Sequence, residues 1–388
     1  ATLRINTLVI TYCNEGIVKT CIIHYFDVCG GGEKLCLDIV RALIELGIDV
    51  ELVVNSVDAL NKCSSLLGTP ISCSVREVGE PLASKLLRFT GRFVRLRRLM
   101  FSRRAYDAIE PLREEFDLFV DTTSNMPSKA DVVYIHHPVR ISTMKGYMNI
   151  IYNSLVKLYA ERRLMGRPKL VLANSTWTAK LVKEVYNVDV EVLHPPVDVN
   201  FFAYDGRRKE KLIVTVSRIT PEKNLHLLAN AASKLKDFEW LLIGSITKEF
   251  RRVLERLRRK IEESEATNLK IITNVSKSDL REYLLRATYY VHPPFPEHFG
   301  ISIAEAMAAG CIPIVYADGG AWEDLVKPID LSLGYMRIED VPSIVRSIEA
   351  RGRDYKAYIM KKALERVSTL SYKVFRDRLG MLLNLMRR

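Results

Sequence analysis

Hydrophobic positions along the chain alternate between two periods, which predicts strands and helices in turn. Residues 21–26 form a short apolar run that a glycine cluster ends, and residues 34–46 then carry leucine and isoleucine at helical spacing. Residues 49–54 form the next apolar run. A strand, a glycine loop, a helix and a second strand in this order predict a βαβ unit of a doubly wound parallel sheet.

The same alternation continues to the end of the chain, interrupted by one charged, irregular stretch at residues 204–210. Before it, further strands are predicted at residues 118–121, 132–136, 169–173 and 191–193. After it, strands are predicted at residues 211–216, 239–243, 269–273, 289–292 and 312–316, and helices at 225–235, 250–263 and 372–386. We interpret the charged stretch as a linker. The sequence therefore predicts two α/β domains, over residues 1–203 and 204–371, followed by a helical segment over 372–388.

Length and composition agree with a two-domain globular protein. With 388 residues the chain exceeds what one hydrophobic core usually supports, and 48% apolar with 27% charged residues is an ordinary balance. No apolar run approaches the ~18–20 residues that cross a bilayer. Residues 1–18 lack the basic and cleavage regions of a secretory signal, so we expect a peripheral extension there. Seven cysteines without a C-x2-C pair favour buried thiols in a reducing, cytosolic compartment over disulfides or a zinc site.

The net charge of +12 is concentrated between Lys85 and Arg104, where eight basic residues alternate with apolar ones and no acid occurs. This composition predicts an interfacial membrane helix. Its alternative is an amphipathic helix packed on its own domain with a solvated basic rim. The predicted lipid contacts are Arg88, Arg92, Arg95, Arg97 and Arg98. Nucleic acid is a weaker partner hypothesis, because none of the usual binding signatures is present.

Candidate chemistry is densest in the segment EHFGISIAEAMAAG, which places Glu297 and Glu305 eight positions apart. Residues at this spacing share one face of a helix, so both carboxylates can point into one cleft. Backbone N–H groups of Phe299, Gly300 and Ile301 would form a phosphate cradle at the helix start. A chance pair on an alanine-rich helix is the alternative. Carboxylates for sugar hydroxyls beside amides for a diphosphate favour a nucleotide-sugar site.

This segment resembles the E-x7-E signature of the retaining glycosyltransferases of family 4. It is especially similar to the dolichol-pathway alpha-1,2-mannosyltransferases, which use GDP-mannose. Arg218 and Lys223 resemble the family's R-x4-K element, and both follow a predicted strand, where they can neutralise a diphosphate. GGGE at residues 30–33 resembles the GGGER loop, with Lys34 in place of arginine, and YIHHP at residues 134–138 resembles Y-V-H-Y-P. The resemblance covers roughly residues 21–370.

The resemblance implies a GT-B fold, in which two Rossmann-like domains face each other across a cleft and the last helix crosses back to the first domain. It implies catalytic roles for Glu297, His136, Arg218 and Lys223. It implies donor binding by Gly31, Gly32, Arg218, Lys223, Val275, Glu297, His298, Phe299, Gly300, Ile301 and Glu305. Within this set, Glu305 would hold the ribose and Glu297 the donor sugar, while His137 is an acceptor-side candidate. No D-x-D pair follows an apolar strand, so we expect no metal ion and no cofactor besides the donor.

The implied activity is transfer of a hexose, with retention, from a nucleotide-sugar to a polyprenol- or dolichol-linked acceptor at the cytosolic face of a membrane. Mannose from GDP-mannose is the leading donor hypothesis. Two alternatives stay open at this point. One is a family 4 enzyme that uses a UDP-sugar and a soluble acceptor. The other is a non-catalytic basic protein that binds anionic lipid or nucleic acid. The sequence is silent on the oligomeric state.

Overall fold

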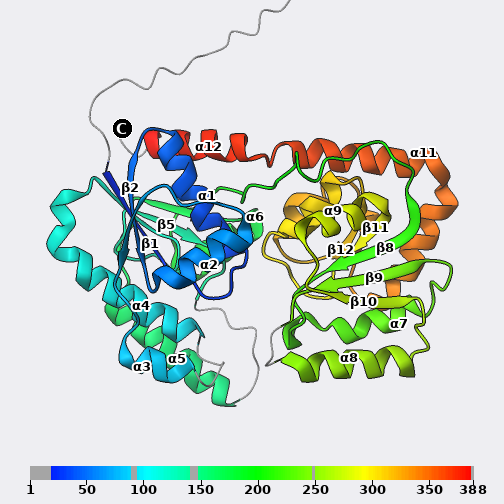
Figure 1. Ribbon diagram of the computed structural model, residues 1–388, viewed down its shortest axis with the longest axis horizontal. Coiled ribbons are helices and arrows are strands. Elements are labelled where there is room, and N and C mark those ends of the chain that lie inside the picture. Colours follow the sequence, from blue (N-terminus) through cyan, green and yellow to red (C-terminus); the bar gives the residue numbers. More distant parts are fainter. Residues whose placement is uncertain (1–18, 89–93, 140–146, 247–249, 386–388) are drawn as a thin grey trace, which may run out of the picture.

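The protein consists of two parallel β-sheets that lie side by side, each covered by helices (Figure 1). The computed structural model describes residues 19–88, 94–139, 147–246 and 250–385. The expected extension over residues 1–18 lies outside them. The predicted pair of doubly wound α/β domains is confirmed.

The first sheet has seven strands in the order β3-β2-β1-β4-β5-β6-β7, all paired in parallel. Its strands are β1 (Lys19–His24), β2 (Asp49–Val54), β3 (Ser74–Glu77), β4 (Leu118–Asp121), β5 (Val132–Ile135), β6 (Leu170–Ala173) and β7 (Glu191–Val192). Its helices are α1 (Gly31–Glu45), α2 (Val57–Leu67), α3 (Leu82–Arg88), α4 (Val94–Ile109), α5 (Tyr147–Arg163) and α6 (Thr176–Tyr186), with a short turn η1 (Glu110–Glu115).

The second sheet has six strands in the order β10-β9-β8-β11-β12-β13, again all parallel. Its strands are β8 (Glu210–Val216), β9 (Glu239–Gly244), β10 (Leu269–Thr273), β11 (Ala287–Val291), β12 (Ile312–Tyr316) and β13 (Gly334–Tyr335). Its helices are α7 (Leu228–Ala232), α8 (Arg251–Glu263), α9 (Lys277–Arg286), α10 (Ile301–Ala308) and α11 (Val341–Ser368). Short turns lie at η2 (Pro221–Lys223), η3 (Leu225–Leu227), η5 (Ala321–Val326), η6 (Leu331–Leu333) and η7 (Ile338–Asp340).

Alternating side chains of the first sheet enter two separate cores, one on each face. Ile22 packs with α1 and α2 residues, while its neighbours Cys21 and Ile23 pack with α4 and α5 residues on the other face. Both faces are covered because parallel strands need helical crossovers. This double burial explains why the strands read as continuous apolar runs.

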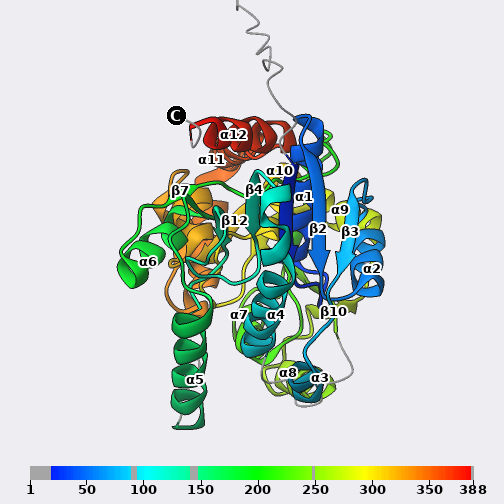
Figure 2. The same ribbon diagram turned by 90° about the vertical axis from the view of Figure 1, so that its left-hand side faces the viewer.

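The C-terminal helix α12 (Tyr372–Leu385) returns from the second domain to the first (Figures 1 and 2). Phe375 and Leu379 are buried in the same core as α1. Arg376 also pairs with Glu45 at the end of α1, with 3.2 Å between Nη1 and Oε2. The chain thus connects the two domains twice, once between β7 and β8 and once between α11 and α12.

The basic segment at residues 85–104 is not one exposed helix, and the predicted lipid contact of Arg97 is wrong. The segment contributes to α3 and α4, and α4 buries Leu99 and Phe101 against the first sheet. The Arg97 side chain is only 4% exposed and lies beside Asp27 and Glu80 at 3.7 and 3.4 Å. Acidic partners from other elements therefore hold this arginine inside the domain.

The side chains of Arg88 and Arg92 lie outside the part of the chain that the structure describes in atomic detail, so their predicted lipid contacts stay predictions. Within the described residues, no helix is both long and apolar enough to cross a bilayer.

One pair of cysteines contradicts the expectation of unpaired thiols. Cys29, just after β1, forms a disulfide with Cys63 of α2, and their Cα atoms are 4.8 Å apart. The two residues are 34 positions apart in sequence, so only the packing of α2 beside the β1 loop brings them together. Cys21, Cys36, Cys73 and Cys311 are unpaired.

Candidate active site in the cleft between the two sheets

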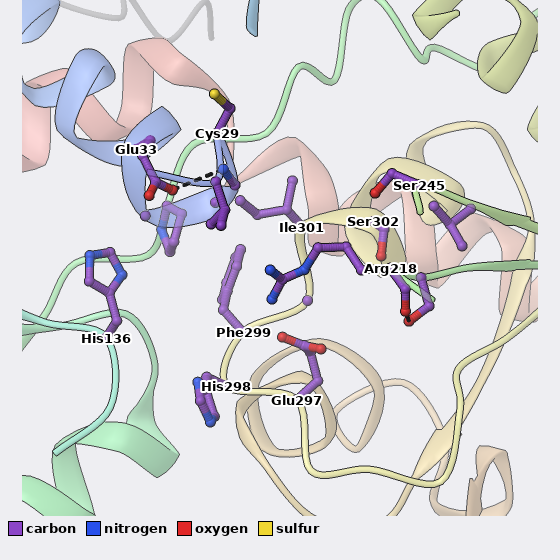
Figure 3. A pocket seen from close by; sticks show the side chains of 18 of the residues that line it. Cys29, Glu33, His136, Arg218, Ser245, Glu297, His298, Phe299, Ile301 and Ser302 are labelled. Carbon is purple, nitrogen blue, oxygen red and sulfur yellow. Dashed lines mark hydrogen bonds between the residues drawn. The ribbon is translucent and has the colours of Figure 1, made fainter. Parts of the chain in front are cut away.

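A cavity of about 620 Å³ lies between the two domains, at the carboxyl ends of both sheets (Figure 3). Parallel sheets place their loops at this edge, where ligands usually bind. The sequence-predicted residues that line it are Gly31, Gly32, His136, Arg218, Lys223, Val275, Glu297, His298, Phe299, Gly300 and Ile301. Glu305 and His137 are not among the lining residues.

Glu297 is held in the cavity as a carboxylate. Its Oε2 is 2.7 Å from Lys223 Nζ and 3.3 Å from His292 Nε2. Burial alone would raise the pKa of Glu297, but Lys223 and His292 outweigh it and hold that pKa well below its usual range. Its backbone is fixed by a bridge to Gly319, where a Cβ atom would lie 2.6 Å from Glu297 O. The side chain therefore presents a fixed negative charge and not a proton donor.

The start of α10 supplies free backbone donors to the same cavity. Its first internal bonds run from the N–H groups of Ile303 and Ala304 to Gly300 O, so the preceding N–H groups have no partner within the helix. Gly300 has φ +92°, and a side chain there would collide with Ile303. This turn points the free amides and the positive end of the helix dipole at the cavity, which suits a phosphate group.

Arg218 projects into the cavity from the loop after β8 and lies close to Glu297 in the view of Figure 3. No acidic side chain of the described residues pairs with it, unlike Lys223 on the following turn η2. Lys223 carries three donors, so it can keep its contact with Glu297 and still bind an oxygen of a ligand. Together the two cations provide charge for a bound diphosphate.

Glu305 lies one turn further along α10 and is half-buried. Burial raises the pKa of Glu305 to about 7, against the attraction of Lys277 and Lys34. Within the described residues no hydrogen bond or ion pair engages its carboxylate. A carboxylate in this state is suited to accept hydrogen bonds from a ligand's hydroxyl groups.

The glycine loop of the first domain forms the opposite wall. Glu33 Oε2 accepts a bond from Gly30 N at 2.9 Å, which caps the start of α1 (Figure 3). A Cβ atom on Gly31 would lie 3.3 Å from Ile301 Cδ1, and one on Gly32 would lie 3.7 Å from His136 Nε2. The loop is therefore close to both α10 of the second domain and His136 of the first.

His136 follows β5 and faces the glycine loop. Its backbone N–H donates to Asn125 Oδ1 at 2.7 Å, and its carbonyl accepts from Asn174 Nδ2 at 3.1 Å. Burial lowers the pKa of His136 to about 4, with Arg98 acting in the same direction. The imidazole is thus neutral near pH 7 and can exchange hydrogen bonds but not act as a cationic acid.

Aromatic rings close one side of the cleft. His137 stacks on His298 of the second domain with ring centroids 4.4 Å apart, and Trp177 stacks on His298 at 5.8 Å. Trp177 Nε1 donates to Asp318 Oδ1 at 2.9 Å. Burial lowers the pKa of His137 to about 3, helped by His298 and Arg95. His137 is therefore engaged in joining the domains, and its predicted acceptor contact stays a prediction.

Arg98, a predicted lipid contact, lines the cavity, and its contact with lipid stays a prediction. Its Nη2 lies 3.5 Å from Glu33 Oε1, beside the glycine loop. Arg95 on the same helix is close enough to His137 and His298 to lower their pKa values. Charge from α4 thus acts on the cleft.

His24, Thr122 and His292 are among the cavity residues that the sequence analysis did not name. His24 is the last residue of β1, while Thr122 and His292 directly follow β4 and β11. That position, at the carboxyl edge of a parallel sheet, is the signal that could have found them.

The fold is shared with solved glycosyltransferases. A glycosyltransferase from Rickettsia africae superposes with a TM-score of 0.69 at 17% identity, over 96% of this chain and 100% of that chain. Two Rossmann-like domains with this cleft define the GT-B class of glycosyltransferases.

Two family models cover most of the chain. The model described as Glycosyltransferase Family 4 matches residues 29–201, and the one described as Glycosyl transferases group 1 matches residues 198–328. The matches run without a gap from the glycine loop to just past η5. The chain therefore carries glycosyltransferase domains of the family 4 type.

Two curated relatives carry the name GDP-Man:Man(3)GlcNAc(2)-PP-Dol alpha-1,2-mannosyltransferase. The protein from Dictyostelium discoideum is 28% identical over 246 residues, which are 57% of this chain and 48% of that protein. The human protein is 30% identical over 229 residues, 53% of this chain and 46% of that protein. The chain spans about half the length of these relatives.

Proposed function

We propose that this protein transfers mannose from GDP-mannose to a lipid-linked oligosaccharide. The observation that carries the proposal is the cavity wall of the second domain, where the unpaired Arg218, Lys223 and the free amides of α10 surround one space. Cationic groups and amides in this arrangement suit a nucleoside diphosphate. The names of the curated relatives support guanosine as the nucleoside and mannose as the sugar.

Each group has a distinct task in this proposal. Glu305 binds the ribose hydroxyls, and Val275 borders the base. Arg218, Lys223 and the α10 amides stabilise the charge of the departing diphosphate, so the proposal needs no metal ion. Glu297, which is kept ionised by Lys223 and His292, lies where it can stabilise positive charge on the sugar.

Transfer with retention is proposed to proceed by attack on the same face that the diphosphate leaves. Within the described residues, the cavity is lined by two carboxylates, Glu297 and Glu33. Both are engaged, Glu297 with Lys223 and Glu33 with Gly30 and Arg98. In the proposed mechanism neither acts as a nucleophile, and the leaving phosphate is the base that accepts the proton of the acceptor hydroxyl.

The acceptor side of the proposal rests on the relatives' names, which specify a dolichol-linked oligosaccharide. The glycine loop and His136 face the sugar from the first domain, and closure of the two domains would complete the site. A lipid-linked acceptor requires the enzyme to work at a membrane surface, and we propose the cytosolic face.

The test is a donor screen by protection from thermal unfolding, with GDP, UDP, ADP and their common sugar conjugates. A ligand at 100 times its dissociation constant adds about 2.7 kcal/mol to the free energy of unfolding. We expect protection by GDP and GDP-mannose and its loss in Glu305→Ala. The matched control is Glu222→Ala, which removes an exposed carboxylate from the turn that also holds Lys223.

Protection by UDP compounds alone would overturn the donor and favour a UDP-sugar enzyme of the same fold. No response to any nucleotide would favour the non-catalytic binding protein. A GDP-protected enzyme would then be assayed with polyprenol-linked and soluble acceptors, and turnover of only the soluble ones would overturn the acceptor.

A further inference from the structure

His24, the last residue of β1, carries a buried nitrogen without a partner at the edge of the cavity. The residue is 4% exposed and lines the cavity. Its Nδ1 lies 2.8 Å from Thr122 Oγ1, while its Nε2 has no hydrogen-bond partner among the described residues.

The Thr122 hydroxyl determines which imidazole nitrogen carries the proton. Thr122 Oγ1 has one hydrogen for two contacts, with the carbonyl of Ile23 at 3.1 Å and with His24 Nδ1 at 2.8 Å. When it donates to Ile23, His24 Nδ1 is the donor of the second contact and Nε2 is a bare lone pair. When it donates to Nδ1, Nε2 carries the ring proton.

A hydroxyl group can satisfy Nε2 in either tautomer, because it both donates and accepts hydrogen bonds. Phosphate and carboxylate oxygens only accept, so they can satisfy only one of the two tautomers. Burial lowers the pKa of His24 to about 3, so the ring does not become an imidazolium that could bind an anion near pH 7. A sugar offers several hydroxyl groups.

The position of His24 relative to His136 supports this assignment. In the sheet order, β4 lies between β1 and β5, so the two histidines flank Thr122 at the same edge. His136 Nε2 also lacks a partner among the described residues. A buried polar atom without a partner is destabilising, which indicates that a ligand completes both rings.

We propose that His24 Nε2 binds a sugar hydroxyl in the cavity, either of the transferred hexose or of the acceptor sugar. The inference rests on the proposed function, since it assigns a further specificity-determining residue to the same site. His24 thereby extends the sugar-binding surface from the histidine loop after β5 to the end of β1.

The decisive variant is His24→Asn, because the asparagine amide N–H₂ can replace Nδ1 toward Thr122 while nothing replaces Nε2. His24→Gln places an amide oxygen near the position of Nε2 and should restore binding. The matched control is Thr20→Val on the same strand, because Thr20 is fully buried and its hydroxyl also lacks a partner, but it does not line the cavity.

Calorimetry with GDP and with GDP-mannose is combined with steady-state kinetics for donor and acceptor. We expect His24→Asn to bind GDP within twofold of wild type and to lose about three- to tenfold in kcat/KM, as for one neutral hydrogen bond. Weaker binding of GDP-mannose alone assigns the hydroxyl to the donor sugar. Unchanged donor binding with a lower kcat/KM for the acceptor assigns it to the acceptor.

The proposal is overturned if His24→Asn equals wild type in both measurements, or if Thr20→Val loses as much. Should His24→Asn not fold, the ¹⁵N resonance of Nε2 in the wild-type protein decides, since it shifts when this nitrogen forms a hydrogen bond with bound sugar. An unshifted resonance overturns the proposal. If the wild-type protein binds neither GDP nor GDP-mannose, the proposed function is wrong, and so is this inference, which rests on it.

Discussion

Glu297 and Glu305 are eight residues apart, yet their carboxylates have opposite electrostatics. Lys223 and His292 keep Glu297 ionised and fully engaged. Glu305 has no such partner among the described residues, and burial dominates its pKa. Glu297 is therefore held as a negative charge, whereas Glu305 takes up a proton near neutral pH.

The raised pKa of Glu305 makes folding stability depend on pH. Its pKa is about 7 in the folded protein, against 4.5 for an ordinary glutamate. The folded state therefore holds a proton that the unfolded state has lost, and stability falls as pH rises from about 4.5 to 7. We expect Glu305→Gln to gain about 1 to 3 kcal/mol relative to wild type at pH 8 and nothing at pH 4.

Urea unfolding of both proteins at the two pH values measures this difference. Glu349→Gln is the control of opposite sign, because Tyr289 and Lys356 hold the pKa of Glu349 below its usual range despite burial. A difference between Glu305→Gln and wild type that is the same at both pH values would show that Glu305 is not desolvated.

Which residues line the cavity was predictable where a local pattern marks them and not where distant partners do. Local sequence patterns singled out Glu297, Arg218 and Gly31, and all three line the cavity. The basic pattern around Arg97 was misleading, because its acidic partner Glu80 lies 17 positions earlier, in the loop between β3 and α3. His24 is marked in the sequence only by its position at the end of a strand, because the contact of its Nδ1 with Thr122 joins residues 98 positions apart.

At the level of elements, central strands were predictable and marginal ones were not. Runs such as β2 and β12 are buried on both faces and read as apolar stretches. The edge strand β3 is largely exposed and β13 has two residues, so neither leaves a hydrophobic pattern. The helix expected at residues 225–235 is shorter, because residues 225–227 form the turn η3 and α7 ends at Ala232.

The disulfide between Cys29 and Cys63 fixes the glycine loop against α2. Cross-linking residues 34 positions apart restricts the unfolded chain and is worth about 3 to 4 kcal/mol. We expect Cys63→Ser to lose this amount in urea unfolding, and a dithiol reductant to destabilise wild type but not the variant.

Cys73→Ser is the matched control, because Cys73 is partly buried and unpaired. Asn55, just after β2, also holds the loop that follows β1. Its side chain accepts a bond from the N–H of Phe26 at 2.7 Å and donates one to the carbonyl of Phe26 at 3.0 Å. The loop should therefore stay folded in the variant. Equal losses in Cys63→Ser and Cys73→Ser would contradict a specific contribution of the bridge.

At the scale of the whole molecule, the cavity exists only while the two domains stay together. Sequence patterns predicted two domains, but the contacts between them join residues more than a hundred positions apart. Asp324, 6% exposed, accepts from Thr176 N at 2.7 Å and lies 3.1 Å from His194 Nε2. It thus places a carboxylate of the second domain at the N-terminus of α6 in the first.

Removal of this carboxylate should open the cleft without destroying either domain. Asp324→Ala leaves the Thr176 amide and His194 without their acceptor, and truncation of one partner of such a buried contact costs about 2 to 5 kcal/mol. Interfaces between domains resemble transient protein interfaces, so a loss of this size shifts the population toward open forms. Small-angle scattering should show a larger radius of gyration. Turnover should fall while GDP affinity is retained, because the groups proposed to bind the diphosphate all belong to the second domain.

Asp237→Ala is the matched control for this experiment, because Asp237 pairs with Arg346 and Lys211 inside the second domain. Acid should act on wild type as the substitution does. Burial alone would raise the pKa of Asp324, but the bonds from His194 and Thr176 outweigh it and hold this pKa below its usual range. The stabilising contribution of the carboxylate is therefore lost only as pH falls through that lowered pKa. If Asp324→Ala keeps the wild-type radius of gyration yet loses GDP binding, the carboxylate supports the nucleotide site directly and the clasp between domains lies elsewhere.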